Sequence, residues 1–303
     1  MWVSSKNCFD MNADVVVIGS GPAGLQAAIS SSRKKADTVL LGKPSNSALS
    51  GTEIENYFGL AGVTEGDVLL SNGTSQAEAF GCRVIRQNVL GASADGDAFT
   101  VEIESGEKIT ARSVVIATGV SRNKLGIPGE KEFFGKGVSY CADCDCNFYR
   151  GVPVAVIGGD SAAAEAAKLL SGYASKVYWI SEGPIADARL VAEAAEAGAE
   201  AVRGAPAEIV GTSGAEAVVL KSGARIPVNG VFIELGGRSS ADIAMDLGLM
   251  PEADDTIKTD PNGGTSVRGV FACGDITGRP WNVAKAVGQG AAAGMSAAEH
   301  SRR

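Results

Sequence analysis

Apolar residues gather in short runs along this chain, and two long stretches repeat the same order of runs. Residues 13–42 begin with the β-branched run VVVI, pass through a glycine turn into an alanine-rich segment, and end in the apolar run TVLL. Residues 152–182 repeat that order and spacing, from VAVI to YWIS. Short apolar runs on either side of a helix-length segment predict a strand, a helix and a parallel strand. We therefore expect two βαβ units.

The segments that follow each unit also share a pattern. Residues 98–104 and 107–119 suit hairpin strands, and residues 215–236 repeat this theme before an apolar run at 269–276. Small residues at 281–300 predict a final helix. A further segment is biased toward Ala and Glu, and we interpret it as surface helix and turn; it covers residues 192–208.

The glycine turn of the first unit predicts a dinucleotide site. Between a strand and a helix, the first glycine makes the tight turn and the second lets the backbone approach a pyrophosphate. The third packs helix on strand, and the phosphates lie at the helix N-terminus. This motif does not separate NAD from FAD, and the acid that usually follows the second strand is replaced by Gly42 and Lys43. The motif residues are Gly19, Gly21, Pro22, Ala23 and Gly24.

Two such units predict an α/β protein with two Rossmann-like domains. The simplest arrangement returns the apolar run at 269–276 and the last helix to the first domain, so the second domain is inserted in the first. We expect the first domain to comprise residues 1–117 and 245–303, and the second domain to comprise residues 118–244.

Size and charge narrow the classes of partner. A chain of 303 residues has room for two cores. Its formal net charge of -8 argues against nucleic acid or an anionic membrane as partner, because both favour a basic face. No apolar stretch reaches about 18 residues, and the first residues lack the apolar core of a signal peptide. We expect a cytoplasmic protein that acts on a small molecule or another protein.

Three of the six cysteines lie in the segment SYCADCDC, residues 139–146. Cys141 and Cys144 form a CxxC pair, which in a reducing compartment indicates metal binding or catalysis. Zinc would need a second pair of ligands, and the chain has neither another CxxC nor a histidine besides His300. No metal site is therefore predicted, and a redox-active dithiol or a structural disulfide remain as interpretations.

Four segments resemble those of the low-molecular-weight thioredoxin reductases, and the resemblance covers essentially the whole chain: EIENYFG (53–59), VVIATG (114–119), GVSYCADCDCNFYRG (137–151) and GVFACGDI (269–276). It implies FAD in the first domain, with Asp275 on the ribityl hydroxyls, Asn56 near the flavin, and the start of the last helix facing the pyrimidine end of the ring. It also implies a homodimer, with a thioredoxin-like protein or a small disulfide or dithiol as partner. The implied FAD contacts are Gly19, Gly21, Pro22, Ala23, Gly24, Asn56, Val89, Thr118, Gly119, Gly274, Asp275, Trp281, Asn282 and Val283.

The same resemblance assigns the CxxC pair to electron exchange between flavin and an outside disulfide. Cys144 would meet the flavin, Cys141 would meet the outside disulfide, and Asp145 would manage the thiolate proton. The charge of Asp143, between the cysteines, would disfavour the thiolate. Cys146 stands where relatives carry glycine, and we interpret it as a small apolar filler or as an extra thiol able to exchange with Cys144. The remaining cysteines are interpreted as filler or inert: Cys8, Cys82 and Cys273.

The chain departs from the reductase pattern at the glycine turn of its second unit. Gly158, Gly159 and Asp160 stand in the places of three glycines, and Asp160 falls where the backbone should approach a pyrophosphate. A carboxylate there adds bulk and like charge, and unit charges about 4 Å apart cost several kcal/mol at intermediate dielectric. We expect this site to reject a pyridine nucleotide in the usual pose.

Two further departures lie after the second strand of that unit and near the C-terminus. Ser181 and Glu182 stand where NADPH-using relatives place a histidine and arginines for the 2′-phosphate. Glu182 would suit an unphosphorylated ribose, as in NADH or the adenosine half of a second FAD, and the alternative is a solvated loop acid. Trp281 replaces an arginine near the flavin edge, either to stack on another ring or to pack in a core or lid. The expected cofactor contacts in the second domain are Gly158, Gly159, Ser161 and Glu182.

These departures favour a pyridine-nucleotide-independent branch of the family, in particular the diflavin-linked disulfide oxidoreductase type. The resulting hypothesis is an FAD-dependent disulfide oxidoreductase that exchanges electrons between flavin and the CxxC pair without NADPH, with a second FAD in the altered nucleotide site. Three alternatives stay open. They are a ferredoxin- or NADH-linked thioredoxin reductase, a small-molecule dithiol oxidase, and a non-enzymatic flavin-binding sensor.

Overall fold

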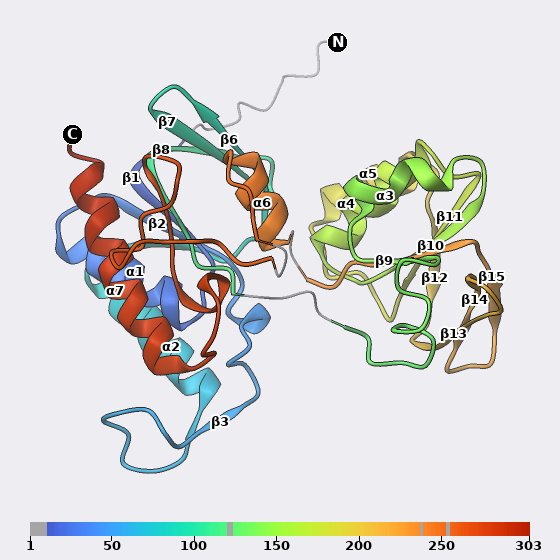
Figure 1. Ribbon diagram of the computed structural model, residues 1–303, viewed down its shortest axis with the longest axis horizontal. Coiled ribbons are helices and arrows are strands. Elements are labelled where there is room, and N and C mark those ends of the chain that lie inside the picture. The colour runs from blue at the N-terminus through green and yellow to red at the C-terminus, as the bar shows by residue number, and fades with distance from the viewer. Residues whose placement is uncertain (1–10, 120–123, 237–238, 253–254) are drawn as a thin grey trace, which may run out of the picture. The chain divides into compact units, whose positions relative to one another are not determined.

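The computed structural model describes residues 11–119, 124–236, 239–252 and 255–303, so Cys8 lies outside the described residues. The chain divides into two compact units (Figure 1). Unit 1 comprises Met1–Ser121 and Arg238–Arg303, and unit 2 comprises Arg122–Gly237. Unit 2 is thus an insertion in the sequence of unit 1.

Unit 1 is built on a sheet whose central strands are parallel and buried on both faces. Val15 and Val17 pack into one core, whereas Val16 and Ile18 pack into a second core on the opposite face. The strand order is β5 (Arg83–Ile85), β2 (Thr38–Leu41), β1 (Met11–Ile18), β8 (Lys108–Ile116), β7 (Ala98–Ile103), β6 (Val89–Asp95), and β17 (Val270–Ala272) pairs with the C-terminal half of β8. A small separate ladder joins β3 (Glu53–Ile54) to β4 (Thr64–Glu65).

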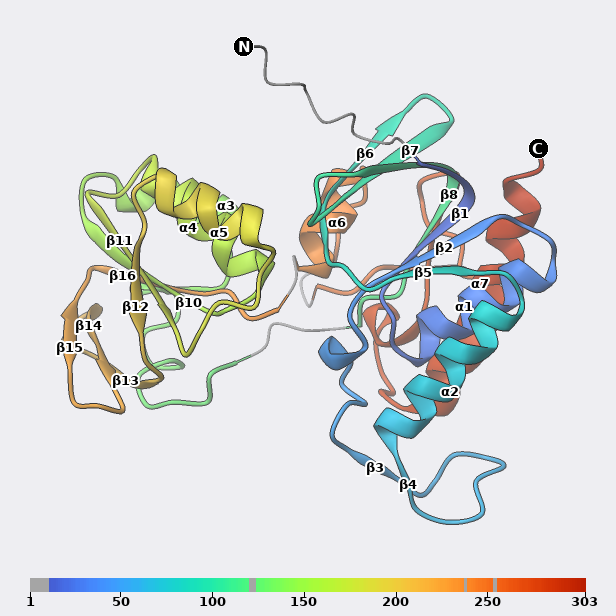
Figure 2. The same cartoon turned by 180° about the vertical axis from the view of Figure 1, so that it is seen from behind.

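Helices cover both faces of this sheet. Three of them, α1 (Pro22–Arg33), α2 (Gly66–Ala79) and α7 (Val283–His300), lie on one face, where their small and apolar residues form a single core with the sheet (Figure 2). On the other face, α6 (Ser240–Asp246) packs Ile243 and Ala244 against the sheet. Short 3-10 turns lie at η1 (Pro44–Asn46) and at η3 (Gly274–Thr277), just after β17.

Unit 2 contains a second parallel sheet and a small antiparallel one. The parallel order is β12 (Glu200–Arg203), β11 (Lys176–Ser181), β10 (Pro153–Ile157), β16 (Gly230–Ile233), β9 (Val138–Ser139). The antiparallel strands are β13 (Pro206–Gly211), β14 (Ala215–Leu220) and β15 (Arg225–Pro227), and the helices are α3 (Ala142–Asp145), η2 (Cys146–Tyr149), α4 (Ser161–Ser171) and α5 (Ala188–Glu196). One core joins the two sheets, with Ile157 and Ile233 from the first and Val218 from the second.

The structure confirms the predicted α/β class with two Rossmann-like sheets, and both βαβ units form where the apolar runs predicted them. The prediction of only helix and turn for residues 192–208 was wrong, because this segment also contains β12 and the start of β13. The expected boundary between residues 244 and 245 falls inside α6, whose packing belongs to unit 1. No helix in the described part of the chain has the length and apolarity needed to cross a membrane.

Candidate functional site

The two CxxC sulfurs are joined in unit 2. Cys141 and Cys144 form a disulfide with an S–S distance of 2.03 Å at the start of α3. Cys141 is the N-cap residue, and its Sγ accepts a hydrogen bond from the Cys144 backbone N–H at 3.2 Å. Cys144 is exposed and Cys141 is half-buried. The pair is therefore held at a helix start with one sulfur open to solvent.

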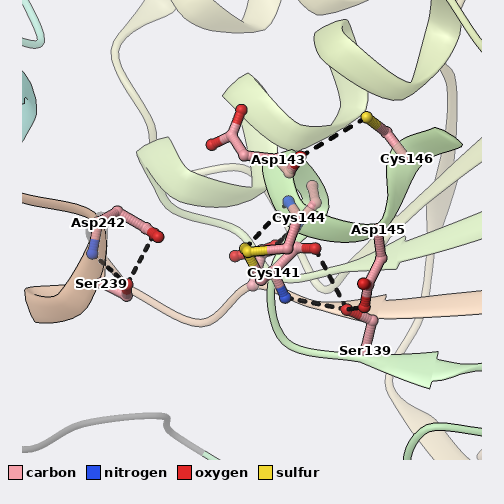
Figure 3. The surroundings of a disulfide bond; sticks show 10 residues. Ser139, Cys141, Asp143, Cys144, Asp145, Cys146, Ser239 and Asp242 are labelled. Carbon is pink, nitrogen blue, oxygen red and sulfur yellow. Dashed lines mark hydrogen bonds between the residues drawn. A yellow bond between two sulfur atoms is a disulfide. The ribbon is translucent and has the colours of Figure 1, made fainter. Parts of the chain in front are cut away.

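Ser139 connects the acid of the site to the backbone of Cys141, and Figure 3 shows this arrangement. The Ser139 hydroxyl donates to Asp145 Oδ2 at 2.7 Å and accepts from the Cys141 N–H at 3.0 Å. Asp145 is half-buried, so this hydrogen bond fixes a partly desolvated carboxylate beside the disulfide turn. Sequence reasoning missed Ser139, although a hydroxyl two residues before a CxxC pair could have indicated a role.

Glu234 fastens the same turn to the parallel sheet. It follows β16, and its Oε1 accepts from the Ala142 N–H at 3.0 Å. Asp143, in contrast, is exposed. The backbone of the CxxC turn is thus supported by two side chains, Ser139 and Glu234, that sequence reasoning did not select.

The other described cysteines are buried away from solvent. Cys146 is 3% exposed, and its Sγ donates to the Asp143 carbonyl at 3.7 Å. Burial raises the pKa of Cys273 to about 12, and it raises the pKa of Cys82 to about 12 as well. The Cys273 and Cys82 thiols therefore carry little thiolate, and the burial of all three cysteines supports the interpretation as packing residues.

The glycine turn of unit 1 has the geometry of an anion site. Gly19 has φ of +112°, and an added Cβ would lie 2.3 Å from the Ala117 carbonyl oxygen. Gly21 is the N-cap of α1, with φ -77° and ψ -177°, and it provides no side-chain cap to the first-turn N–H groups. A helix N-terminus without its own cap attracts negative groups such as phosphates.

Two buried oxygen atoms next to this turn have no hydrogen-bond partner among the described residues. They are Thr118 Oγ1 and Asp275 Oδ1. Burial raises the pKa of the Asp275 carboxyl, and the charge of Lys285 opposes that shift. Buried polar atoms are almost always paired, so unpaired ones beside an anion site indicate that the site suits a ligand with hydroxyl donors. The residues present therefore fit FAD.

The structure brings some of the expected FAD contacts close to one another in unit 1. An added Cβ on Gly274 would lie 2.7 Å from Ala23 Cβ, which places η3 against the first turn of α1. Asn282 caps α7 by accepting from the Lys285 N–H at 2.7 Å. Val283 packs against the core cluster that contains Ala23. Asn56 is exposed, Val89 lies in the core of unit 1, and Trp281 is 51% exposed under the Arg279 guanidinium.

The glycine turn of unit 2 repeats the backbone of the first but not its chemistry. Gly158 has φ of +152°, and an added Cβ would lie 1.9 Å from the Glu234 carbonyl oxygen, just as Gly19 packs on Ala117. Asp160 is the N-cap of α4, with φ -96° and ψ -175°, so it occupies the position that Gly21 holds in unit 1. Its side chain is 3% exposed, and Oδ1 accepts from the Ser161 N–H at 2.9 Å. The N-terminus of α4 therefore already holds a carboxylate.

Charged residues of both signs lie where the neighbouring strands β11 and β12 end. Glu182 follows the strand and is exposed. Arg203, which is also exposed, lies opposite Ser181 in the register of β11 and β12. Sequence reasoning missed this cation because β12 itself was not predicted. Glu182 and Arg203 therefore place one charge of each sign at this end of the sheet.

This chain is similar to known proteins both in sequence and in fold. Residues 13–290 match the family model described as pyridine nucleotide-disulphide oxidoreductase. A thioredoxin reductase from Aquifex aeolicus (strain VF5) is 36% identical over 288 residues, which cover 91% of this chain and 89% of that protein.

Two solved structures extend the comparison. The atypical thioredoxin reductase TRi from Desulfovibrio vulgaris Hildenborough is 34% identical, with a TM-score of 0.77 and coverage of 95% of this chain and 98% of that one. A ferredoxin-flavin thioredoxin reductase from Clostridium acetobutylicum is 31% identical, with a TM-score of 0.66. The match covers 95% of this chain and 98% of that one.

Proposed function

Because this chain belongs to the pyridine nucleotide-disulphide oxidoreductase family, as a thioredoxin reductase-like flavin disulfide oxidoreductase, we propose that it exchanges electrons between FAD and the Cys141–Cys144 pair without NADPH as donor. The partner is a thioredoxin-like protein or a small disulfide or dithiol, and the enzyme is a homodimer. The carboxylate of Asp160 at the N-terminus of α4 is the observation that carries the claim on NADPH.

The dithiol exchange balances without any further reactant. The Cys141 thiolate attacks one sulfur of the outside disulfide, which forms a mixed disulfide and releases one substrate thiolate. Cys144 then attacks Cys141 Sγ, so the Cys141–Cys144 disulfide forms and the second substrate thiolate leaves. Two electrons pass to the substrate, and Asp145, held by Ser139, transfers the proton of the attacking thiol. The reverse sequence oxidises a substrate dithiol.

FAD would be held in unit 1 by the glycine turn and by the segments that close over it. Its pyrophosphate would lie at the uncapped start of α1, and its ribityl hydroxyls would satisfy Asp275 Oδ1. When bound, the flavin supplies or accepts the two electrons of the dithiol. The proposed contacts are Gly19, Gly21, Pro22, Ala23, Gly24, Asn56, Val89, Thr118, Gly119, Gly274, Asp275, Trp281, Asn282 and Val283.

Asp160 opposes any dinucleotide in unit 2 whose pyrophosphate lies at the start of α4. Its carboxylate occupies the Ser161 N–H that would bind a phosphate oxygen, and its charge repels the phosphate. NADPH and NADH both carry this pyrophosphate, so Asp160 opposes both. A second FAD, contacting Gly158, Gly159, Ser161 and Glu182, is the alternative occupant, and its pyrophosphate would have to lie away from the helix start.

A ferredoxin-linked reductase is the second candidate. It is favoured by the 31% identity to the ferredoxin-flavin thioredoxin reductase over 95% of this chain. That type also dispenses with a pyridine nucleotide in unit 2, so it agrees with the carboxylate cap of Asp160. Anaerobic reduction of the bound flavin by reduced ferredoxin, measured beside reduction by NADPH, separates it from the diflavin type.

Three measurements on the purified chain test the proposal. Flavin released per chain counts one FAD or two, and sedimentation gives the oligomeric state. In an anaerobic titration, stoichiometric NADPH is expected to leave the flavin absorbance unchanged, while dithionite bleaches it. Rapid bleaching by NADPH would overturn the claim on the donor.

Single cysteine variants test the assigned roles. Cys144→Ser should accumulate a mixed disulfide between Cys141 and an oxidised thioredoxin-like protein, because the resolving sulfur is absent. Cys141→Ser is the matched control and should not trap that partner. Mass spectrometry reads both, and trapping by Cys141→Ser alone would reverse the roles of the two sulfurs.

A further inference from the structure

Lys285 lies in the first turn of α7, where a cation is electrostatically out of place. The N-terminus of a helix is the positive end of its dipole, so a lysine there is disfavoured unless its ammonium group has other partners. Lys285 has them: its half-buried Nζ donates to the Gly274 carbonyl at 3.2 Å and also donates to the Gly278 carbonyl. Both carbonyls belong to the η3 turn or to the residue that ends it.

Gln289, one helical turn further along α7, holds the same turn from its other side. Its Oε1 accepts from the Gly274 N–H at 3.0 Å and from Thr277 Oγ1 at 2.9 Å. Residues four apart on a helix share a face, so Lys285 and Gln289 together bind both backbone polar groups of Gly274. The η3 turn is thus fixed to α7 by one cation and one amide.

Asp275 lies within this fixed turn, and it needs a counter-charge. Its Oδ1 is buried without a partner among the described residues, and a carboxylate removed from water is costly unless an opposite charge or donor compensates it. Lys285 provides the charge that acts on it. The pairing is reciprocal, since the ammonium group is also partly withdrawn from water.

We propose that Lys285 is a positioning residue for the flavin: it anchors the η3 turn that carries Asp275 and supplies the counter-charge for that carboxylate. The proposal rests on FAD binding in unit 1. FAD binding is measured on the parent chain and the role of Lys285 on its variants, so the two ideas can fail separately.

Lys285→Met tests the proposal, because it keeps an unbranched side chain of similar bulk and removes the charge and its donors. The apo-chain is titrated with FAD by flavin fluorescence, and the midpoint potential of the bound flavin is measured by spectroelectrochemistry. We expect FAD binding to weaken by about tenfold, the effect of one lost hydrogen bond to a charged group. The midpoint potential should fall, because a nearby cation favours the electron-rich form of the flavin.

Three further variants keep the result interpretable. Lys285→Arg retains the charge and should restore the potential, whereas Lys108→Met removes an exposed lysine elsewhere in unit 1 and should match the parent. If Lys285→Met fails to fold, Lys285→Met combined with Asp275→Asn removes the need for a counter-charge and should fold again. FAD affinity and potential in Lys285→Met equal to those of the parent would overturn the proposal. A parent chain that binds no FAD would instead overturn the proposed function.

Discussion

Replacing Asp160 by glycine should give unit 2 the affinity for a dinucleotide that its own carboxylate now opposes. Asp160 and Gly21 hold equivalent N-cap positions with nearly equal backbone angles, φ -96° and ψ -175° against φ -77° and ψ -177°. Glycine can adopt that backbone, so Asp160→Gly would reproduce the turn of unit 1 in unit 2. The variant frees the Ser161 N–H, to which Asp160 Oδ1 now accepts at 2.9 Å.

The size of the effect follows from the charge that is removed. Two unit charges about 4 Å apart interact by about 4 kcal/mol at an effective dielectric constant of about 20. Each 1.4 kcal/mol, roughly, is a factor of ten in Kd, so relief of this repulsion tightens dinucleotide binding by about 100- to 1000-fold. The fold should tolerate the change, because glycine in place of an N-cap aspartate costs only about a few tenths of a kcal/mol.

Calorimetric titration with NADH and with NADPH measures the gain, since both share the pyrophosphate that Asp160 would face. Asp187→Gly is the matched control: Asp187 is an exposed N-cap of α5 in the same unit, and its Oδ1 accepts from the Arg189 N–H at 2.9 Å. This control loses a carboxylate cap without touching the glycine turn, and it should bind nucleotide no better than the parent.

The reciprocal variant applies the same reasoning to unit 1. Gly21→Asp places a carboxylate at the start of α1, where an added Cβ meets Ser47 Oγ at 3.3 Å, a contact that a flexible hydroxyl can accommodate. FAD affinity should fall by a comparable factor. A folded, flavin-loaded Asp160→Gly chain whose Kd for both nucleotides stays within twofold of the parent would refute the assignment of Asp160 as the blocking group.

Three smaller tests address other parts of the chain. Ser139→Ala should slow dithiol exchange by about tenfold in stopped-flow assays, since a hydrogen bond to a carboxylate contributes about 1.5–3 kcal/mol; Ser139→Thr should restore it, and an unchanged rate would contradict the role given to Asp145. Cys273, whose pKa burial raises to about 12, should resist alkylation until the chain unfolds, as followed by mass spectrometry. Burial lowers the pKa of His300, so the unfolded chain takes up a proton at higher pH than the native chain and stability should fall as the pH drops below about 6.5. Urea unfolding across this range should show a weaker pH dependence in His300→Gln, and equal slopes would contradict it.

Runs of apolar residues in the sequence predicted the strands that are buried in the fold. The run at Val15–Ile18 is apolar at every position because the strand is covered on both faces, and that pattern is visible without any structure. β12 (Glu200–Arg203) was missed for the opposite reason. It is the edge strand of its sheet, and three of its four residues are exposed, so no apolar run marks it.

The residues of the candidate site divide along the same line. Gly19 and Cys141 could be selected from short motifs, because the motif itself expresses the local geometry. Ser139 accepts from a backbone N–H only two residues away, so the hydroxyl before the CxxC pair could also have been selected from sequence. Glu234 and Lys285 bind backbone groups that lie further along the chain, at a separation of 92 residues for Glu234 and Ala142 and of 11 residues for Lys285 and Gly274. No pattern within a short window reports such a contact.

The two glycine turns show how one backbone supports two kinds of chemistry. The positive end of a helix can be compensated by an outside anion or by a side chain of its own, and the two compete for the same N–H groups. Gly21 leaves the start of α1 to a ligand, whereas Asp160 closes the start of α4 while the rest of unit 2 keeps the packing that supports its sheet. Unit 2 also carries the Cys141–Cys144 pair, which Ser139 and Glu234 hold in place. Under the proposed function, electrons must therefore reach or leave this pair through the flavin of unit 1 and through the outside disulfide, so the donor should be a carrier that acts on flavin or on dithiol directly.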